Sequence, residues 1–272
     1  MWQAIARLSI GFLCCLGLWL GGGQLPAQGT DSEALKALHQ DLDQIYQQAF
    51  QATEAGDFGN AEALWTAAIE RMPENPATWS NRGNARLSQF KLEEAIADFN
   101  QSIAIAPDQP GPYVNRGIAW EGKADWDRAI ADYNHALELD PDDPVTLNNR
   151  GNAEGGQGHW EAAQADFERA ANLRPGFAMP RINAALASYQ LGQKHEALRQ
   201  MKNLVRRYPM AADTRAALTA MLWDAGQRGE AESNWVSAVG LDPRYRDLDW
   251  VSHIRRWPPA LVSALQRFLK LE

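Results

Sequence analysis

The sequence predicts an all-α protein, an α-solenoid of six helix–turn–helix units with a capping helix at each end. Three observations predict this fold. Proline recurs every 34 residues without a break, and small and large apolar residues return with the same period, which indicates one repeated supersecondary unit. Ala, Leu, Gln and Glu, which favour helices, recur throughout the chain, whereas strand-forming residues do not cluster. The periodic prolines are Pro73, Pro107, Pro141, Pro175, Pro209 and Pro243.

A secretory signal peptide is predicted at residues 1–27. Arg7 precedes an apolar run from Leu8 to Leu20, and Ala27 fits the small-residue position before a cleavage site. The run is shorter than the roughly 20 residues that a membrane-spanning helix prefers, but an uncleaved N-terminal anchor stays open. Cys14 and Cys15 lie inside this run, so the chain beyond it has no cysteine and no disulfide. The sequence therefore predicts an exported protein.

A cap, six repeats and a second cap are expected after the signal peptide. Residues 28–41 form the N-terminal cap, continuous with the first repeat helix, with Asp31 or Ser32 as its N-cap. The C-terminal capping segment, residues 246–272, places apolar side chains on one helix face and is expected to be a lid on the final hairpin. Those side chains are Leu261, Leu265, Phe268 and Leu269. The repeats between the caps occupy 42–75, 76–109, 110–143, 144–177, 178–211 and 212–245.

The residues within each unit follow one pattern, which we number from position 1 to position 34 with the proline at position 32. Position 8 is small in most units, position 20 is alanine and position 24 is large and apolar, which predicts a close helix–helix contact in each hairpin. "GDF" at 56, "ADW" at 124 and "GHW" at 158 mark the turns between helices. This pattern resembles the tetratricopeptide repeat family over residues 42–245. The resemblance implies a right-handed superhelix whose first helices line a concave groove, and a role in protein–protein interaction.

A structural role is predicted for an arginine and an aspartate that occur together. Position 7 is arginine and position 23 is aspartate in the second, third and fourth repeats, and neither residue is present in the other three. Because arginine fits a carboxylate with two hydrogen bonds, we expect ion pairs between helices, within a hairpin or reaching the next one. Ligand binding by these arginines is the weaker alternative. The predicted pairs are Arg82 with Asp98, Arg116 with Asp132, and Arg150 with Asp166.

An asparagine ladder is the candidate binding site. Positions 2, 6, 9 and 13 fall on the side of the first helix opposite to its packed side, since a helix turns about 100° per residue. Position 6 is asparagine in repeats two to five, and these four positions carry no charge in those repeats. An amide side chain both donates and accepts hydrogen bonds, so the ladder can pair with the backbone of an extended peptide. The candidate peptide-binding residues are Asn81, Asn84, Asn115, Asn149, Asn152 and Asn183.

Two other interpretations of the ladder compete with binding of a peptide backbone. The asparagines can instead be repeat background that hydrogen-bonds to a neighbouring helix or to water. Some members of the family hold a terminal carboxylate with groove lysines and arginines, but the central positions here lack those charges. The end repeats carry acids at positions 2 and 13, Asp43 and Glu54 in the first and Asp213 and Asp224 in the sixth.

A basic and aromatic cluster in the C-terminal segment is the second candidate site. Arg255, Arg256 and Trp257 belong to the one dense cluster of this kind in an acidic chain. They fit either a cap, with the arginines on nearby acids, or a docking patch for an acidic partner. The stretches "DLDW" and "IRRWPP" make the tail similar to exported tetratricopeptide repeat proteins of cyanobacteria and the chloroplast thylakoid lumen. That resemblance implies a lumenal or periplasmic protein and an accessory role in photosynthetic complexes.

Charge and residue spacing argue against other classes of protein. Beyond residue 27 the chain carries 25 basic and 34 acidic residues, a net charge of −9. Nucleic acid is therefore not an expected partner. An anionic membrane surface is not expected either, unless the N-terminal segment is retained as an anchor. The histidines lie far apart, and no metal-ligand spacing, calcium loop or catalytic triad can be assigned.

The function predicted from the sequence is a non-catalytic scaffold without metal or cofactor that binds a protein or peptide partner in its groove. The alternative is a structural adaptor that docks a folded acidic partner or an envelope enzyme through its tail or convex face.

Overall fold

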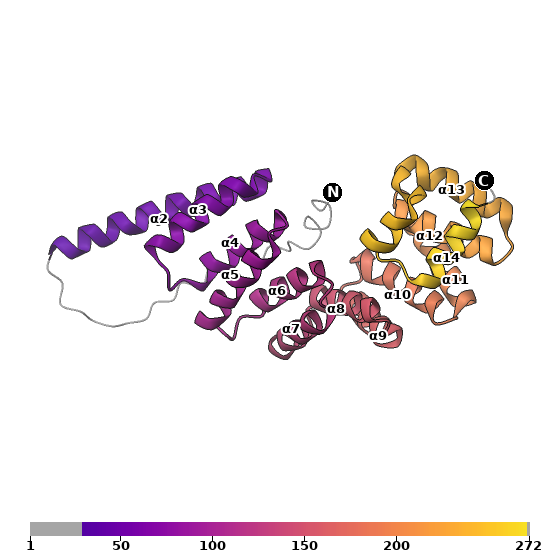
Figure 1. Ribbon diagram of the computed structural model, residues 1–272, viewed down its shortest axis with the longest axis horizontal. Coiled ribbons are helices and arrows are strands. Elements are labelled where there is room, and N and C mark those ends of the chain that lie inside the picture. The colour runs from indigo at the N-terminus through magenta and orange to yellow at the C-terminus, as the bar shows by residue number, and fades with distance from the viewer. Residues whose placement is uncertain (1–28, 271–272) are drawn as a thin grey trace. The chain divides into compact units, whose positions relative to one another are not determined.

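The computed structural model describes residues 29–270, and every regular element in that range is a helix (Figure 1). The predicted signal peptide, residues 1–27, lies outside the described residues. The first described helix, α2, runs without interruption over Gly29–Ala55, so it contains both the expected cap and the first helix of the first repeat. It begins at Gly29, so Asp31 and Ser32 lie inside the helix and the N-cap expected at one of them is wrong by a few residues, a common error at helix ends.

The described residues up to Leu139 form one compact unit of three helical hairpins, which we call the N-terminal unit. Each helix packs against the next one along the chain, and α4 also touches α6. After α2 the helices are α3 (Phe58–Arg71), α4 (Pro76–Ser88), α5 (Leu92–Ile105), α6 (Pro110–Gly122) and α7 (Trp126–Leu139).

The residues from Asp140 onward form a second compact unit, the C-terminal unit. It contains three further hairpins, followed by two short helical turns and a last helix. The hairpins are α8 (Pro144–Gln157) with α9 (Trp160–Leu173), α10 (Ala178–Gln190) with α11 (Lys194–Arg207), and α12 (Ala212–Asp224) with α13 (Arg228–Leu241). The 3-10 turn η1 (Pro243–Arg246), the π-helical turn η2 (Trp250–Ile254) and α14 (Pro259–Leu269) complete the chain.

Prolines and residues in the left-handed backbone conformation mark the ends of the helices. A first helix begins at Pro76, Pro110 or Pro144, where the missing N–H costs no hydrogen bond. Position 15, between the two helices of a hairpin, has positive φ in all six repeats. Glycine, which adopts this conformation without strain, occupies it in four repeats, and Phe90 (φ 63°) and Ala124 (φ 56°) occupy it in the other two.

The core of each hairpin is an aromatic or large apolar residue on the second helix against a small residue on the first. Gly117 on α6 faces Tyr133 on α7, and a Cβ atom at Gly117 would lie 2.6 Å from the Tyr133 ring. Gly83 and Gly151 lie equally close to Phe99 and Phe167. Where the small residue is Ala49 or Ala185, the large partner is a tryptophan or a methionine, Trp65 or Met201.

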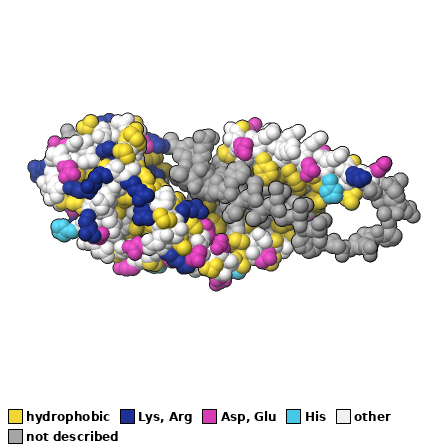
Figure 2. All heavy atoms as spheres, turned by 180° about the vertical axis from the view of Figure 1, so that it is seen from behind, with side chains coloured by type: hydrophobic (Ala, Val, Ile, Leu, Met, Phe, Trp, Pro, Cys, Tyr) yellow, Lys and Arg dark blue, Asp and Glu magenta, His cyan; other side chains and the backbone are white. Residues whose placement is uncertain are grey.

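The two units differ in charge. Residues 29–139 contain 8 basic and 18 acidic residues, and residues 140–270 contain 17 basic and 15 acidic residues. Their net charges are therefore −10 and +2. On the face seen in Figure 2, the Lys and Arg side chains gather over the C-terminal unit. The acidity of the whole chain thus belongs to its N-terminal unit.

The position of the last helix, α14, differs from the expected lid on the final hairpin. It packs against α12 and α10, the first helices of the sixth and fifth repeats, with Leu261, Leu265 and Phe268 buried between them. The expected amphipathic helix is therefore present, but it covers first helices of two repeats and is more than a lid on the final hairpin.

Candidate functional site

We define the inner face of each unit by positions 2, 6, 9 and 13 of its first helices. In the N-terminal unit, α2 contributes Asp43, Gln47, Phe50 and Glu54, α4 contributes Ala77, Asn81, Asn84 and Ser88, and α6 contributes Gly111, Asn115, Ile118 and Gly122. In the C-terminal unit, α8 contributes Val145, Asn149, Asn152 and Gly156, α10 contributes Met179, Asn183, Leu186 and Gln190, and α12 contributes Asp213, Ala217, Ala220 and Asp224.

Arginine–aspartate pairs hold the helices behind this face. Arg82 on α4 binds both oxygens of Asp98 on α5, at 2.7 Å and 3.0 Å. Asp98 is only 2% exposed and also accepts a hydrogen bond from Arg86 at 2.9 Å. The pairs of Arg116 with Asp132 and of Arg150 with Asp166 have the same two-bond geometry. All three predicted pairs therefore join the two helices of one hairpin.

These arginines also reach the preceding hairpin. The remaining Nη1 group of Arg82 donates to the Thr66 hydroxyl on α3 at 3.2 Å, and that of Arg116 donates to Asn100 on α5 at 2.6 Å. The hydrogen bonds that Arg116 donates to Asp132 outweigh the opposing effect of burial and raise the pKa of Arg116. The arginines thus tie three helices together and orient the first helices whose asparagines line the inner face.

In the N-terminal unit the ladder asparagines do not bond to one another. Asn81, Asn84 and Asn115 are half-buried on α4 and α6. Within the described part of the chain, none of their side-chain amides has a hydrogen-bond partner. Their donor and acceptor groups are thus not used by other described residues.

In the C-terminal unit the corresponding asparagines bond to one another. The Asn183 amide nitrogen on α10 donates to Asn148 at 3.1 Å and to Asn152 at 3.3 Å, both on α8. Asn149 is 7% exposed, and its amide nitrogen is buried without a hydrogen-bond partner. For Asn183 and Asn152 the structure thus follows the alternative in which the asparagine bonds to a neighbouring helix. Sequence reasoning missed Asn148, which stands one position before the ladder.

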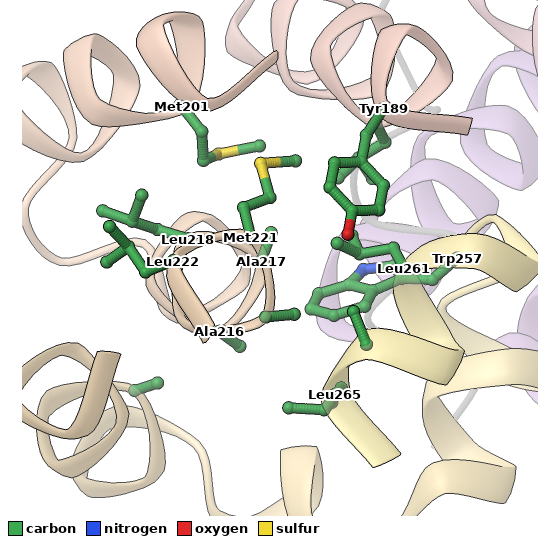
Figure 3. Close-up of a cluster of buried hydrophobic side chains, with 14 of the residues drawn as sticks. Tyr189, Met201, Ala216, Ala217, Leu218, Met221, Leu222, Trp257, Leu261 and Leu265 are labelled. Carbon is green, nitrogen blue, oxygen red and sulfur yellow. The ribbon is translucent and has the colours of Figure 1, made fainter. Parts of the chain in front are cut away.

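The chain's own tail occupies the inner face of the sixth repeat. Asp213, at position 2 of α12, pairs with the Arg255 guanidinium and accepts hydrogen bonds from the Tyr245 hydroxyl at 2.6 Å and from the Trp257 ring N–H at 3.1 Å. Burial is the main cause of a raised Tyr245 pKa, and the charge of Asp213 adds to it. Figure 3 shows Trp257 and Leu261 directed at α12 and at Tyr189.

The far end of α12 is held in the same way. Asp224, at position 13, binds Arg267 of α14 at 2.5 Å, Lys194 at 2.7 Å and the Tyr189 hydroxyl at 2.7 Å. Burial alone would raise the pKa of Asp224, but these three donors outweigh it and lower the pKa to about 2. The tail also reaches the fifth repeat, where the Ala260 N–H donates to Gln190 at 2.8 Å.

Two of the three residues expected to dock a partner are used within the chain, which corrects that expectation. The Arg255 charge is neutralised by Asp213, and Trp257 is 4% exposed. Arg256 is half-buried and has positive φ, 54°. Arg255 and Trp257 instead follow the other interpretation of the sequence, in which this segment is a cap whose arginines pair with nearby acids. Alanine at positions 6 and 9 of the sixth repeat, in place of the ladder residues, was the sequence signal for this contact, since it leaves room for a covering helix.

Other kinds of site find no support in the described part of the chain. No group of three or more His, Cys, Asp or Glu side chains there could hold a metal ion. Between residues 29 and 270, no helix has the length and apolar character needed to span a membrane.

Comparison with known families agrees with the repeat pattern. Residues 46–110 match the family described as "Tetratricopeptide repeat", and residues 124–158 match the family described as "TPR repeat". The chain thus contains tetratricopeptide repeats, as the 34-residue period predicted. No protein with a curated function matches the sequence.

Solved structures share the fold at low sequence identity. Pseudomonas aeruginosa pilF is similar with a TM-score of 0.66 and 15% identity, covering 87% of this chain and 100% of its own. A tetratricopeptide repeat protein from Parabacteroides merdae has a TM-score of 0.64 and 19% identity, covering 85% of this chain and 86% of its own. YrrB, described as a TPR protein with an unusual peptide-binding site, has a TM-score of 0.55 and 19% identity, covering 75% of this chain and 97% of its own. The predicted solenoid of tetratricopeptide repeats is thus confirmed.

Proposed function

We propose that the protein is a non-catalytic scaffold that binds an extended peptide segment on the inner face of its N-terminal unit. Asn81, Asn84 and Asn115 would hold the peptide backbone. The proposal narrows the six asparagines expected from the sequence to three, because Asn183 and Asn152 are bonded to each other and Asn149 is buried.

The observation that carries the proposal is the set of three half-buried amides without partners among the described residues. Each amide has a donor and an acceptor, which matches a peptide group in an extended chain. The arginine–aspartate pairs behind α4 and α6 fix the spacing of these amides before any ligand arrives. Such preorganisation lowers the entropy lost on binding. The description of YrrB as having a peptide-binding site shows that this repeat can support the function in another protein.

The test compares the full-length protein with a variant in which Asn81, Asn84 and Asn115 are changed to alanine. Both are applied to an array of unbiased 12-residue peptides, and affinities for the bound peptides are measured by calorimetry. Losing three hydrogen bonds of about 1 kcal/mol each should weaken binding by roughly 100-fold. Asn60→Ala, an exposed asparagine on α3, is the control and should bind as the original protein does. Equal binding by the triple variant, with unchanged circular dichroism, would reject the proposal.

We further propose that the protein works in an exported compartment, the thylakoid lumen or the periplasm, as an accessory factor for photosynthetic complexes. The order of charges and apolar residues in residues 1–27 supports export, and the "DLDW" and "IRRWPP" stretches support the compartment. Residues 1–40 fused to alkaline phosphatase, which is active only after export, provide the test. An inactive, cytoplasmic fusion would contradict the proposal, and a mature N-terminus at Gln28 would identify the cleavage site.

A further inference from the structure

We propose that the first repeat recognises a basic, amphipathic segment of a partner protein. Its cations would bind Asp43 and Glu54 at the two ends of the inner face of α2, and its apolar side chains would rest on Phe50 between them. This inference rests on the proposed function, because it names the partner chemistry for the same inner face.

The first and sixth repeats carry the same pair of acids at equivalent positions. Asp43 and Asp213 stand at position 2, and Glu54 and Asp224 stand at position 13. The two carboxylates of each pair are 11 residues apart on one helix, which places them about 16 Å apart along its axis. The four central repeats have uncharged residues at both positions. The acid pair is therefore a property of the end repeats alone.

The sixth repeat shows what such a pair binds. Asp213 holds Arg255, and Asp224 holds Arg267, so the two arginines lie near opposite ends of α12. Leu261 and Leu265, between the two arginines in the sequence, and Phe268, next to Arg267, bury their side chains, and the Phe268 ring meets Trp223 edge-on at 5.3 Å. The ligand in this case is the chain's own tail, an amphipathic segment with one cation before its apolar side chains and another near their C-terminal end.

In the first repeat the same acids have no such ligand. Asp43 and Glu54 are exposed, and neither forms an ion pair within residues 29–270. Phe50 lies between them on the same helix face, 40% exposed, with its ring edge-on to Trp65 at 5.1 Å. An aromatic ring fixed from behind and open in front is a favourable contact for an apolar side chain. The net charge of −10 on the N-terminal unit favours a basic partner over an acidic one.

The two repeats differ in one respect that bears on the fit. The sixth repeat has Ala217 and Ala220 where the first has Gln47 and Phe50. A segment bound to the first repeat therefore cannot approach α2 as closely as α14 approaches α12. It would lie across the Phe50 ring and reach the carboxylates with long cationic side chains, which lysine and arginine provide.

The test uses the full-length protein and a labelled synthetic peptide with the sequence of residues 254–270, followed by fluorescence anisotropy. A second peptide carries glutamine in place of Arg255, Arg256 and Arg267. The protein should bind the first peptide, and the Asp43→Asn/Glu54→Gln variant should bind it about tenfold more weakly, since two exposed ion pairs contribute up to 1 kcal/mol each. Glu70→Gln/Glu74→Gln removes the same charge from exposed sites elsewhere in the first repeat and should leave the affinity within about twofold, because distant exposed charges are screened.

Each outcome decides the matter. If the full-length protein does not bind the peptide, or if the Asp43→Asn/Glu54→Gln variant binds it unchanged, the inference is wrong. Equal binding of the arginine-free peptide also overturns it. The variant with Asn81, Asn84 and Asn115 changed to alanine separates the two proposals. If it still binds the tail peptide while the acid variant does not, the acid site is supported and the asparagine site is not. If it loses the tail peptide while the acid variant still binds it, the asparagine site is supported and the acid site is not.

Discussion

Single glycine residues decide how closely the helices of a hairpin approach. Our first prediction concerns Gly117→Ala. This substitution would put a Cβ atom 2.6 Å from the buried ring of Tyr133. The ring must then move within a packed core, so the free energy of unfolding should fall by about 1–3 kcal/mol. Urea denaturation followed by circular dichroism measures the change. Gly111→Ala, on the same helix and with no atom within 4 Å of its Cβ, is the control and should be neutral or slightly stabilising. Equal loss in both variants would contradict the packing argument.

The arginine–aspartate pairs make a second prediction at the residue scale. Asp132→Leu leaves the partly buried Arg116 without its carboxylate and should cost about 3 kcal/mol of unfolding free energy. The double variant Arg116→Met/Asp132→Leu removes both charges, and because apolar residues of similar volume replace a buried pair at little cost, it should recover much of that loss. The same denaturation experiment measures both. If the double variant is less stable than the single one, the Arg116 contact with Asn100 matters more than the pair.

Some residue contacts could be predicted from the sequence, and others could not. The joint presence of Arg82 and Asp98 in one repeat showed their pairing, because a periodic sequence repeats its contacts. The hydrogen-bond partners of each asparagine could not be predicted from the sequence, because they depend on the neighbouring helix. Asn183 finds its acceptors on Asn148 and Asn152, whereas Asn115 lies among residues that offer no partner within the described part of the chain.

At the scale of elements, the tail helix was predictable but its position was not. The spacing of Leu261, Leu265 and Phe268 indicated an amphipathic helix. Its docking face depends on what α10 and α12 present, namely small residues at Ala217 and Ala220 and carboxylates at both ends of α12. The spacing of apolar residues predicts which side of a helix is buried, but it does not predict which neighbouring helix covers that side.

The attachment of this tail should depend on pH. The pKa of Asp224 is lowered from 3.8 to about 2 in the folded chain, because its bonds to Lys194, Tyr189 and Arg267 outweigh the effect of burial. A depressed carboxyl pKa contributes stability above the unfolded pKa and loses it as pH falls toward the folded one. The protection factors of the α14 amides, which correct for the intrinsic pH dependence of exchange, should therefore fall between about pH 4 and pH 2.

The control for this pH effect is Asp224→Asn, which removes the charge at all pH values. The variant should show faster α14 exchange already at pH 6 and a smaller further change below pH 4. Asp249→Asn, at an exposed carboxyl before η2, should behave as the original protein does. A variant at Asp224 that retained the full pH dependence would place the acid sensitivity elsewhere.

For the whole molecule, the repeat architecture and the unequal charge suggest a division of tasks between its two compact units. On the inner face of the N-terminal unit, the ladder amides and the two acids of α2 have no hydrogen-bond or ion-pair partner among residues 29–270, whereas the inner face of the sixth repeat binds the chain's own tail. The 34-residue period predicted the number of hairpins. It could not predict this difference, because the period describes what the repeats share and the tail contact depends on residues in which the sixth repeat departs from the others.

The last prediction concerns how stability is distributed along the chain. In a repeat protein each hairpin contacts mainly its neighbours, so a substitution should destabilise its own surroundings first. Phe268→Ala removes a ring packed on Trp223 and Trp235 and should cost about 3–5 kcal/mol. Segment-resolved hydrogen exchange should then show loss of protection over α10 to α14, with α4 to α7 unchanged, and Gly117→Ala should give the opposite pattern. Uniform loss of protection along the chain in both variants would mean that the whole protein unfolds as one cooperative unit, in contrast to the local coupling that the hairpin contacts imply.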